Sequence, residues 1–423
     1  MRVLLCTAGT RGDVLPMIAV ASAMKQRGHD VILLTNPAFE SMAAEAGIGF
    51  RPIGHADDID AMRAHPEAWS YSKGWKVWFR GSGIVPMREL FAAVKELHVP
   101  GHTIVGAAYL CVGARIAREV LGVPTATLHV NVHTVRSIHS TCAMPSPGWL
   151  PEWVPNFYTL PPGSPAWYRR FMLGIVDRFF FDPVFRPDIE QFRRELNLPA
   201  LTEYVRDWWN SPDLAIGLFP DWWAGPHHDW PQHAVTTSFP FWDRSESMPL
   251  SEDLHEFLTN AGPVLVFSPG ASSGHTEMHF AAYQQVCQQL GHCGLVLTPN
   301  PPETHANNIR FEKFVPFGKL LPHAAAVVHH AGIGTSAQCL AAGVPQVVVP
   351  TLYNQPDTAV RLRRLGVAHC LKPWNFDATR LQTAVRGVLD SKETAASCRK
   401  WATRLADGDA LSEICAHLES LQP

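Results

Sequence analysis

Short apolar runs alternate with helix-like patterns twice along this chain, and this alternation constrains the fold more than any other feature. The run Val3–Cys6 leads through the loop TAGTRGD into a helical pattern at Val14–Arg27, and a second apolar run, Gly28–Thr35, follows. A strand, helix and strand in this order imply parallel strands joined by a right-handed crossover. Further apolar runs lie at 48–53, 103–108, 124–130 and 213–219, with helical patterns at 86–97 and 111–121. The first half is therefore predicted to be a doubly wound α/β domain.

The second half begins the alternation again. Apolar runs lie at 263–270, 293–299, 311–317, 324–330 and 344–350, and helical patterns separate them at 276–290, 335–342, 355–365 and 377–390. Two separate parallel sheets are expected, each with a carboxyl edge that can hold a ligand. The predicted fold class is α/β with two Rossmann-like domains.

Turn-forming residues suggest where the domains divide. We expect an N-terminal domain at 1–225, a linker at 226–245 that begins within the turn-forming stretch PDWWAGPHHDWPQ, and a C-terminal domain at 246–408. The last segment, 409–423, carries a helical pattern and is expected to pack back on the first domain. The Pro- and aromatic-rich stretch 131–209 interrupts the first alternation, which is typical of binding loops or a lid.

Composition excludes several classes of function. The chain of 423 residues has 35 basic and 38 acidic residues without a long charge run, so no nucleic-acid partner is predicted. Its nine cysteines form no CxxC pair, which indicates neither a zinc site nor a disulfide framework and suits the cytoplasm. No run approaches the roughly 18 apolar residues of a membrane span. The 14 Trp and 21 Phe are core residues or the lining of an apolar pocket.

The stretch HHAGIGTS, residues 329–336, carries the strongest chemical signal. A buried strand ends in a glycine-containing turn, and a helix is predicted to begin near Thr335. Unpaired N–H groups at a helix start favour an anion such as a diphosphate, and His330 and two hydroxyl residues can add donors. The alternative is an ordinary turn with an N-cap threonine.

Asp13, in GTRGDVLP, is the candidate catalytic residue. It follows a strand end, in a loop expected to face a cleft, and a single carboxylate suffices to take a proton from an attacking hydroxyl. The alternative is that Asp13 caps a helix starting at Val14, and both roles are compatible.

The block from Phe314 to Val367 resembles the nucleotide-sugar signature of the UDP-glycosyltransferase superfamily, whose members have the GT-B fold with two domains facing a cleft. The resemblance implies three groups of donor-binding residues. They are His330, Gly332, Gly334, Thr335, Ser336, Gly270 and Ser272 for the diphosphate, Phe314, Val315 and Gln338 for base and ribose, and Asn354 and Gln355 for the sugar. Gln338 and Asn354 stand where relatives often have a carboxylate, and Ala331 where a glycine is common.

The N-terminal pattern TxGDVxP resembles the bacterial antibiotic, sterol and rhamnolipid-type branch, in which the aspartate is the proposed base. Stretches 186–198, 218–232 and 237–243 resemble rhamnolipid-type rhamnosyltransferases. By family analogy the acceptor lies against the first domain. The candidate pocket residues are Thr10, Trp69, Trp78, Phe79 and Trp149, and the aromatic ones among them are equally compatible with a core.

The resemblance implies an inverting glycosyltransferase that needs no metal or other cofactor. It would move a sugar from a UDP-glucose or dTDP-rhamnose type donor to a hydroxyl of a hydrophobic lipid, polyketide or terpenoid acceptor. The alternatives are a GT-B-like sugar-nucleotide epimerase or hydrolase, and a non-catalytic partner subunit. Peripheral membrane contact and oligomeric state stay open.

Overall fold

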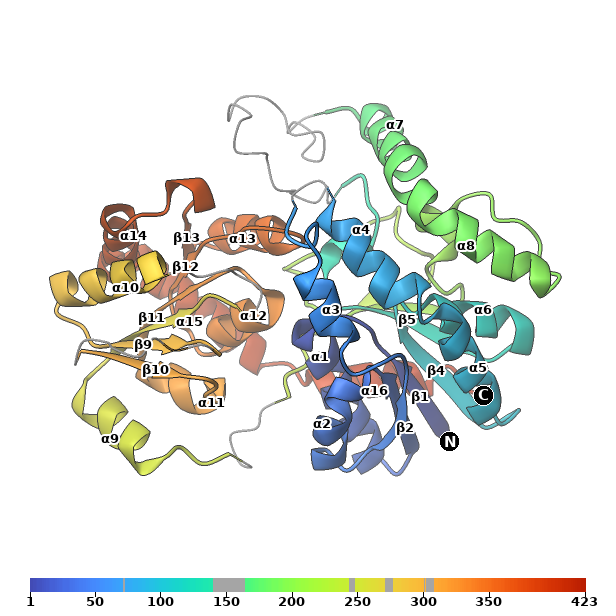
Figure 1. The fold of residues 1–423 in the computed structure, drawn as a ribbon, viewed down its shortest axis with the longest axis horizontal. Coiled ribbons are helices and arrows are strands. Elements are labelled where there is room, and N and C mark those ends of the chain that lie inside the picture. Colours follow the sequence, from blue (N-terminus) through green and yellow to red (C-terminus); the bar gives the residue numbers. More distant parts are fainter. Residues whose placement is uncertain (71–72, 140–163, 243–247, 271–276, 300, 302–307) are drawn as a thin grey trace. The chain divides into compact units, whose positions relative to one another are not determined.

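The computed structural model describes residues 1–70, 73–139, 164–242, 248–270, 277–299, 301 and 308–423. The chain divides into two compact units. Among the described residues, the first unit comprises 1–139, 164–242 and 409–423, and the second comprises 248–408. Each unit contains one parallel sheet with helices on both faces (Figure 1), so the predicted α/β fold class is confirmed.

The first sheet has seven parallel strands in the order β3-β2-β1-β4-β5-β6-β7. The order reverses between β1 and β4, which pair in register with Cys6 opposite Ala107. In open α/β sheets, ligands bind at the carboxyl ends of the strands at such a reversal. The strands are β1 Arg2–Cys6, β2 Asp30–Thr35, β3 Gly49–Pro52, β4 Thr103–Ala108, β5 Thr125–His129, β6 Leu214–Gly217 and β7 Ala234–Thr236.

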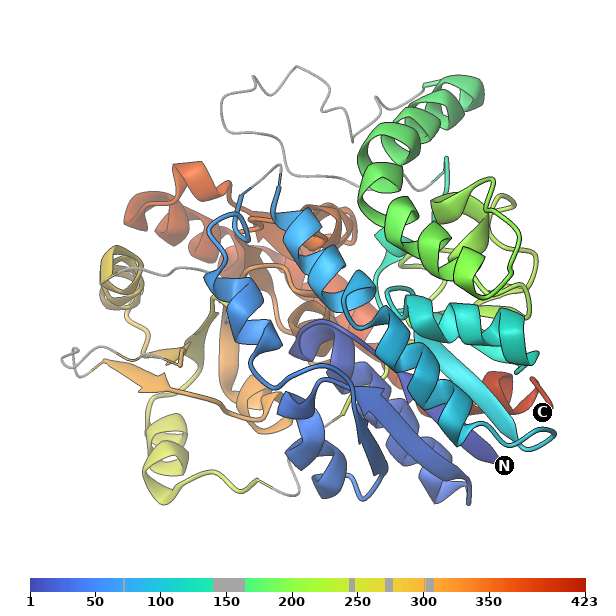
Figure 2. The same ribbon diagram turned by 45° about the vertical axis from the view of Figure 1, so that its right-hand side comes forward.

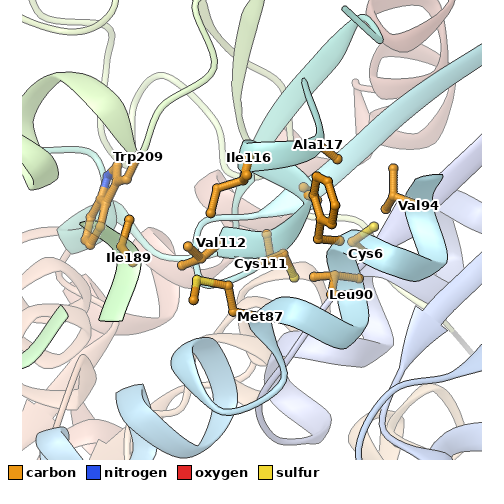
Figure 3. Packing of buried hydrophobic residues seen from close by; sticks show 14 of the residues in the cluster. Cys6, Met87, Leu90, Val94, Cys111, Val112, Ile116, Ala117, Ile189 and Trp209 are labelled. Carbon is orange, nitrogen blue, oxygen red and sulfur yellow. The ribbon is translucent and has the colours of Figure 1, made fainter. Parts of the chain in front are cut away.

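Helices on both sides bury the first sheet. Figure 3 shows Cys6 of β1 beside Leu90 of α5 and Cys111, directly before α6, all of them buried. Gly113 lets α6 approach α5, because a β-carbon there would collide with the carbonyl oxygen of Met87. The helices are α1 Arg11–Gln26, α2 Glu40–Glu45, α3 Asp58–Ala64, α4 Gly74–Phe79, α5 Met87–Leu97, α6 Val112–Leu121, α7 Ala166–Val176, α8 Asp182–Glu195 and α16 Ala410–Glu419. Short 3-10 or π-helical turns are η1 Pro37–Phe39, η2 Arg80–Ile84, η3 Val132–Thr134, η4 Asp177–Phe181 and η5 Tyr204–Trp208.

The second sheet has six parallel strands in the order β10-β9-β8-β11-β12-β13, reversing between β8 and β11. Alternate residues of β8 enter two different apolar clusters, one on each face of the sheet. The strands are β8 Val264–Ser268, β9 Gly294–Leu297, β10 Ile309–Glu312, β11 Ala324–His329, β12 Gln346–Val348 and β13 Ala368–Cys370. The helices are α9 Glu252–Asn260, α10 Glu277–Leu290, α11 Phe317–Leu320, α12 Ile333–Ala341, α13 Gln355–Arg364, α14 Ala378–Asp390 and α15 Lys392–Ala406, with 3-10 turns η6 Leu321–His323 and η7 Pro373–Asn375.

The C-terminal helix α16 returns to the first unit and lies against α1 (Figures 1 and 2). Glu419 near its end accepts hydrogen bonds from the Arg27 guanidinium at 2.6 and 2.8 Å, and its Oε1 lies 2.8 Å from His29 Nε2. These contacts lower the pKa of the Glu419 carboxyl to about 2. The last segment of the chain is thus fixed to the first strand–helix–strand unit.

The structure differs from the sequence prediction in the linker and in one strand. The predicted linker 226–245 contains β7, whose pairing with β6 extends the first unit to Trp242. The predicted strand 311–317 is wrong beyond Glu312, because β10 ends there and α11 begins at Phe317. Both errors involve short strands, for which local apolar patterns carry little information. Among the described residues, no helix is long and apolar enough to span a membrane.

Candidate active site

Asp13 lies in the first turn of α1, directly after the loop that follows β1. Helix α1 begins at Arg11, and Thr10 is its N-cap residue. The Asp13 carboxylate oxygen Oδ2 accepts hydrogen bonds from the Thr10 backbone N–H at 2.9 Å and from the Thr10 hydroxyl at 3.3 Å. A helix starting at Val14 with Asp13 as its cap is therefore wrong. Asp13 instead bonds backwards, from the first turn of the helix to the cap residue.

The other carboxylate oxygen of Asp13 is available. Within the described part of the chain, Oδ1 has no hydrogen-bond partner. Burial raises the pKa of the half-buried Asp13 carboxyl, and the two hydrogen bonds from Thr10 oppose that shift. One oxygen thus fixes the side chain, and the second can accept a proton from a ligand.

Gly9 makes this position of the carboxylate possible. Its φ of 121° lies in the region that favours glycine, and a β-carbon on it would lie 2.5 Å from Asp13 Oδ2. A larger residue at this position would displace the carboxylate from its bonds to Thr10. Glycine at position 9 is therefore required both by the backbone conformation and by the space that the Asp13 carboxylate occupies.

In the second unit, His330 packs between two of the predicted diphosphate-binding glycines. A β-carbon on Gly270 would lie 2.7 Å from the imidazole, and one on Gly332 would lie 2.5 Å from its Nε2. His330 Nδ1 lies 3.4 Å from the Ser268 carbonyl oxygen, and burial lowers the pKa of the imidazole. The carboxyl ends of β8 and β11 thus bring Gly270, His330 and Gly332 together, with Nε2 directed toward the start of α12.

The start of α12 lacks a side-chain cap. Its N-cap residue is Gly332, whereas serine or aspartate side chains accept backbone N–H groups at the starts of α9, α14, α15 and α16. The first N–H groups of a helix have no partner inside the helix. A β-carbon on Gly334 would meet no atom of the described residues within 4 Å. The half-buried Thr335 hydroxyl has no partner among the described residues. These groups form a set of donors suited to an anion.

Ser336 is turned inward. Its hydroxyl donates to the Gly332 carbonyl oxygen at 2.8 Å, and the residue is fully buried. The hydroxyl therefore acts within the helix in this structure, which differs from its predicted contact with the diphosphate. A serine at this position of a helix can bond back to the preceding turn, and the sequence pattern does not distinguish the two orientations.

The turn between β11 and α12 is held by His329, whose ring makes an edge-to-face contact with that of His330, with centroids 6.4 Å apart. His329 Nδ1 accepts the Ala331 N–H at 3.2 Å, so Nε2 carries the proton and donates to the Gln346 side-chain oxygen at 2.9 Å. Ala331 adopts φ of 64°, a left-handed conformation that is unusual for alanine. Alanine at position 331, where glycine is common, therefore strains the backbone of this turn.

The remaining donor-site candidates lie near the same edge of the second sheet. Phe314 is 43% exposed in the loop after β10, whereas the Val315 side chain is buried in the core, so that only its backbone is available.

The candidates for ribose and sugar binding make contacts within their own helices and turns. Gln338 donates to the Gly334 carbonyl oxygen at 3.3 Å. Asn354 precedes α13, and Gln355 uses its side-chain oxygen to accept the N–H groups of Thr351 and Leu352. Ser272 lies outside the described residues.

The predicted acceptor residues separate into two groups. Trp69 and Trp78 contact one another with ring centroids 6.1 Å apart, and Thr10 caps α1 beside Asp13. Phe79 instead contacts Phe185 and joins the aromatic part of the core. Trp149 lies outside the described residues. Phe79 therefore fits the alternative that it is a core residue, although it is only partly buried.

Sequence reasoning missed Tyr109, which follows β4 at the reversal of strand order. Its ring is half-buried, and burial together with the Asp13 carboxylate raises the pKa of its phenol. The sequence feature that could have indicated Tyr109 is its position directly after the apolar run 103–108. An aromatic residue after a strand is common in cores, so position alone did not single it out.

Two family models match this chain, one in each half. Residues 3–140 match the glycosyltransferase family 28 N-terminal domain, and residues 301–421 match the erythromycin biosynthesis protein CIII-like C-terminal domain. The O-mycaminosyltylonolide 6-deoxyallosyltransferase of Streptomyces fradiae is 27% identical over 99% of this chain and 97% of its own. The chain belongs to the UDP-glycosyltransferase superfamily.

Other relatives of this glycosyltransferase come from antibiotic pathways. The vancomycin aglycone glucosyltransferase of Amycolatopsis orientalis is 26% identical over 97% of this chain and 96% of the relative. Two solved structures share the GT-B fold. The glycotransferase of kitacinnamycin has a TM-score of 0.74 at 17% identity, and VinC, crystallised with dTDP, has 0.70 at 19%, each covering 100% of this chain and 99% of the other. The bacterial antibiotic branch is confirmed, and the resemblance to rhamnolipid-type enzymes stays a prediction.

Proposed function

We propose that this glycosyltransferase transfers a sugar from a nucleoside diphosphate donor to a hydroxyl of a hydrophobic natural product, with inversion and without a metal ion. The open start of α12 beside His330 carries the donor half of this proposal. Its N–H groups, the Thr335 hydroxyl and the imidazole are donors in one place, and none of the described residues fills the space beside Gly334. The relatives named for macrolide and glycopeptide substrates suggest the acceptor class.

In the proposed reaction, the acceptor oxygen attacks the anomeric carbon and its proton passes to Asp13 Oδ1. The bond between the anomeric carbon and the β-phosphate oxygen breaks, and negative charge develops on the leaving diphosphate. The donors at the start of α12 are suited to stabilise that charge without a metal ion. Because one carboxylate acts as base and no second group forms a covalent intermediate, the anomeric centre inverts.

His330 has a defined protonation in this scheme. Its imidazole is neutral without ligand, since burial lowers its pKa. A bound diphosphate favours the charged form, in which Nδ1 donates to the Ser268 carbonyl and Nε2 donates to a phosphate oxygen. Nucleotide binding therefore takes up a proton at this residue.

The test begins with the donor. Thermal unfolding with UDP, dTDP and GDP identifies the base, because a tight ligand raises the melting temperature by mass action. The matching glucose donor is then assayed with hydroxylated macrolide aglycones and aromatic polyketides, with and without EDTA. We expect transfer that survives EDTA and gives a β-glucoside from the α-linked donor. A product with retained configuration contradicts the mechanism, and donor turnover that never requires an acceptor supports an epimerase or hydrolase instead.

A further inference from the structure

Tyr109 lies beside the segment that carries Asp13. Strands β1 and β4 pair with Cys6 opposite Ala107, so the residues that follow, Thr7 and Ala8, run alongside Ala108 and Tyr109. The Thr7 hydroxyl donates to the Asp13 carbonyl oxygen at 3.2 Å, which ties the first turn of α1 to the end of β1. Sheet pairing and this bond together bring Tyr109 next to Asp13.

The ring of Tyr109 is held by three neighbours. Its centroid lies 5.2 Å from Trp209, 6.0 Å from Phe79 and 6.4 Å from His129, and it is nearly parallel to the imidazole. These contacts fix the direction of the phenol C–O bond. The Tyr109 hydroxyl therefore has a set position, as needed for a group that orients a ligand.

The Tyr109 hydroxyl is unused in this structure. Among the described residues it has no hydrogen-bond partner, which is also true of Asp13 Oδ1, and both residues are half-buried. Burial and the neighbouring carboxylate raise the pKa of the phenol. Tyr109 thus stays protonated and acts as a hydrogen-bond donor rather than as a base.

We propose that Tyr109 binds the acceptor: its phenol donates a hydrogen bond to a second acceptor oxygen near the reacting hydroxyl and so directs that hydroxyl toward Asp13 Oδ1. This inference rests on the proposed base role of Asp13. The favoured acceptors carry a carbonyl, hydroxyl or ether oxygen close to the glycosylated hydroxyl, on an apolar body. The transferred proton goes to Asp13, and Tyr109 keeps its own.

The test is Tyr109→Phe, which removes only the hydroxyl and retains the ring contacts. The expected result is a loss of about 10-fold to 100-fold in kcat/KM for the acceptor, with nucleotide affinity and melting temperature unchanged. Hydrolysis of the donor by water should not change, since water needs no second contact. An acceptor analogue that lacks the neighbouring oxygen should react poorly with the wild type and lose nothing further in the variant.

Tyr204→Phe is the matched control. Tyr204 belongs to the same aromatic cluster and contacts Phe185 and Trp209, but it is 2% exposed and its phenol interacts with Asp182 instead. This variant should transfer sugar like the wild type.

Two results for Tyr109→Phe would overturn the inference: unchanged acceptor kinetics, or an equal loss of sugar transfer and donor hydrolysis. Asp13→Asn is measured in parallel. If it transfers normally, the base role and the inference both fail, and if only Tyr109→Phe transfers normally, the inference alone fails.

Discussion

The starts of α1 and α12 follow strands on opposite sides of the reversal in their sheets, β1 in the first and β11 in the second, and they have opposite chemistry. Each follows a strand at the reversal of strand order and begins after a glycine-containing turn. At α1 the chain supplies its own anion, because Asp13 accepts the N–H of the cap residue Thr10. At α12 the cap is Gly332, which supplies none.

This difference explains how one folding unit can serve two substrates. A carboxylate in the first turn of α1 interacts favourably with the positive end of the helix and would repel a phosphate there. An uncapped start with nearby donors attracts a phosphate instead. The two domains therefore divide the proposed reaction, with proton transfer at α1 and stabilisation of the leaving group at α12.

The largest expected effect comes from removing the proposed base at α1. Asp13→Asn keeps a side-chain oxygen for the Thr10 N–H, so α1 should remain capped. We expect transfer to fall about 100-fold or more, while donor affinity stays within a few-fold of the wild type. Single-turnover kinetics and nucleotide titration measure the two quantities. Wild-type transfer would remove Asp13 from the chemistry.

Placing an anion at α12 should make it resemble α1. Gly334→Asp adds a carboxylate in the first turn of α12, at a position where no described residue would obstruct its β-carbon. We expect donor affinity to fall by about 10-fold or more through repulsion of the diphosphate. The uncharged match is Gly334→Asn, which should lose only a few-fold. Equal losses in the two variants would show that size, and not charge, decides the effect. Calorimetry with the donor makes the comparison.

The pH dependence of donor binding distinguishes the two sites further. The pKa of His330 is lowered in the free protein, and a diphosphate raises it, so binding takes up a proton between these two values. Affinity should therefore fall a few-fold per pH unit as pH rises from about 6 to 8. UDP-glucose is a suitable probe because its diphosphate does not titrate in this range. The dependence of donor affinity on pH should vanish in His330→Asn. If it persists in that variant, another group takes up the proton.

The smallest expected effect concerns strain in the α12 turn. Ala331 has φ of 64°, and replacing it by glycine removes an unfavourable left-handed conformation. Ala331→Gly should stabilise the protein by about 0.5–1 kcal/mol, after the larger entropy of glycine in the unfolded chain is included. Gly291→Ala, at φ of 68° with no atom of the described residues within 4 Å of the added β-carbon, is the reverse change and should destabilise by about 1 kcal/mol. Urea unfolding compares both, and destabilisation by Ala331→Gly would contradict the strain at this turn.

Local patterns were sufficient to find both strand–helix turns, although the helices begin two or three residues earlier than predicted, at Arg11 and Ile333. Apolar runs, glycines and hydroxyl residues identified the turns that carry Asp13 and His330, because a strand–loop–helix unit is determined over a short stretch. Long-range contacts decided what the sequence did not predict. The inward hydroxyl of Ser336 depends on the Gly332 carbonyl, and the place of Tyr109 depends on pairing between strands about a hundred residues apart. Strand β7 was missed because three residues carry too short a pattern.

The central claim is that the open start of α12 binds the donor diphosphate. A crystal structure with the nucleotide that raises the melting temperature most tests this directly. We predict phosphate oxygens within hydrogen-bond distance of the Gly334 and Thr335 backbone N–H groups and of His330 Nε2. A well-ordered nucleotide whose phosphates contact none of these three groups would contradict the account.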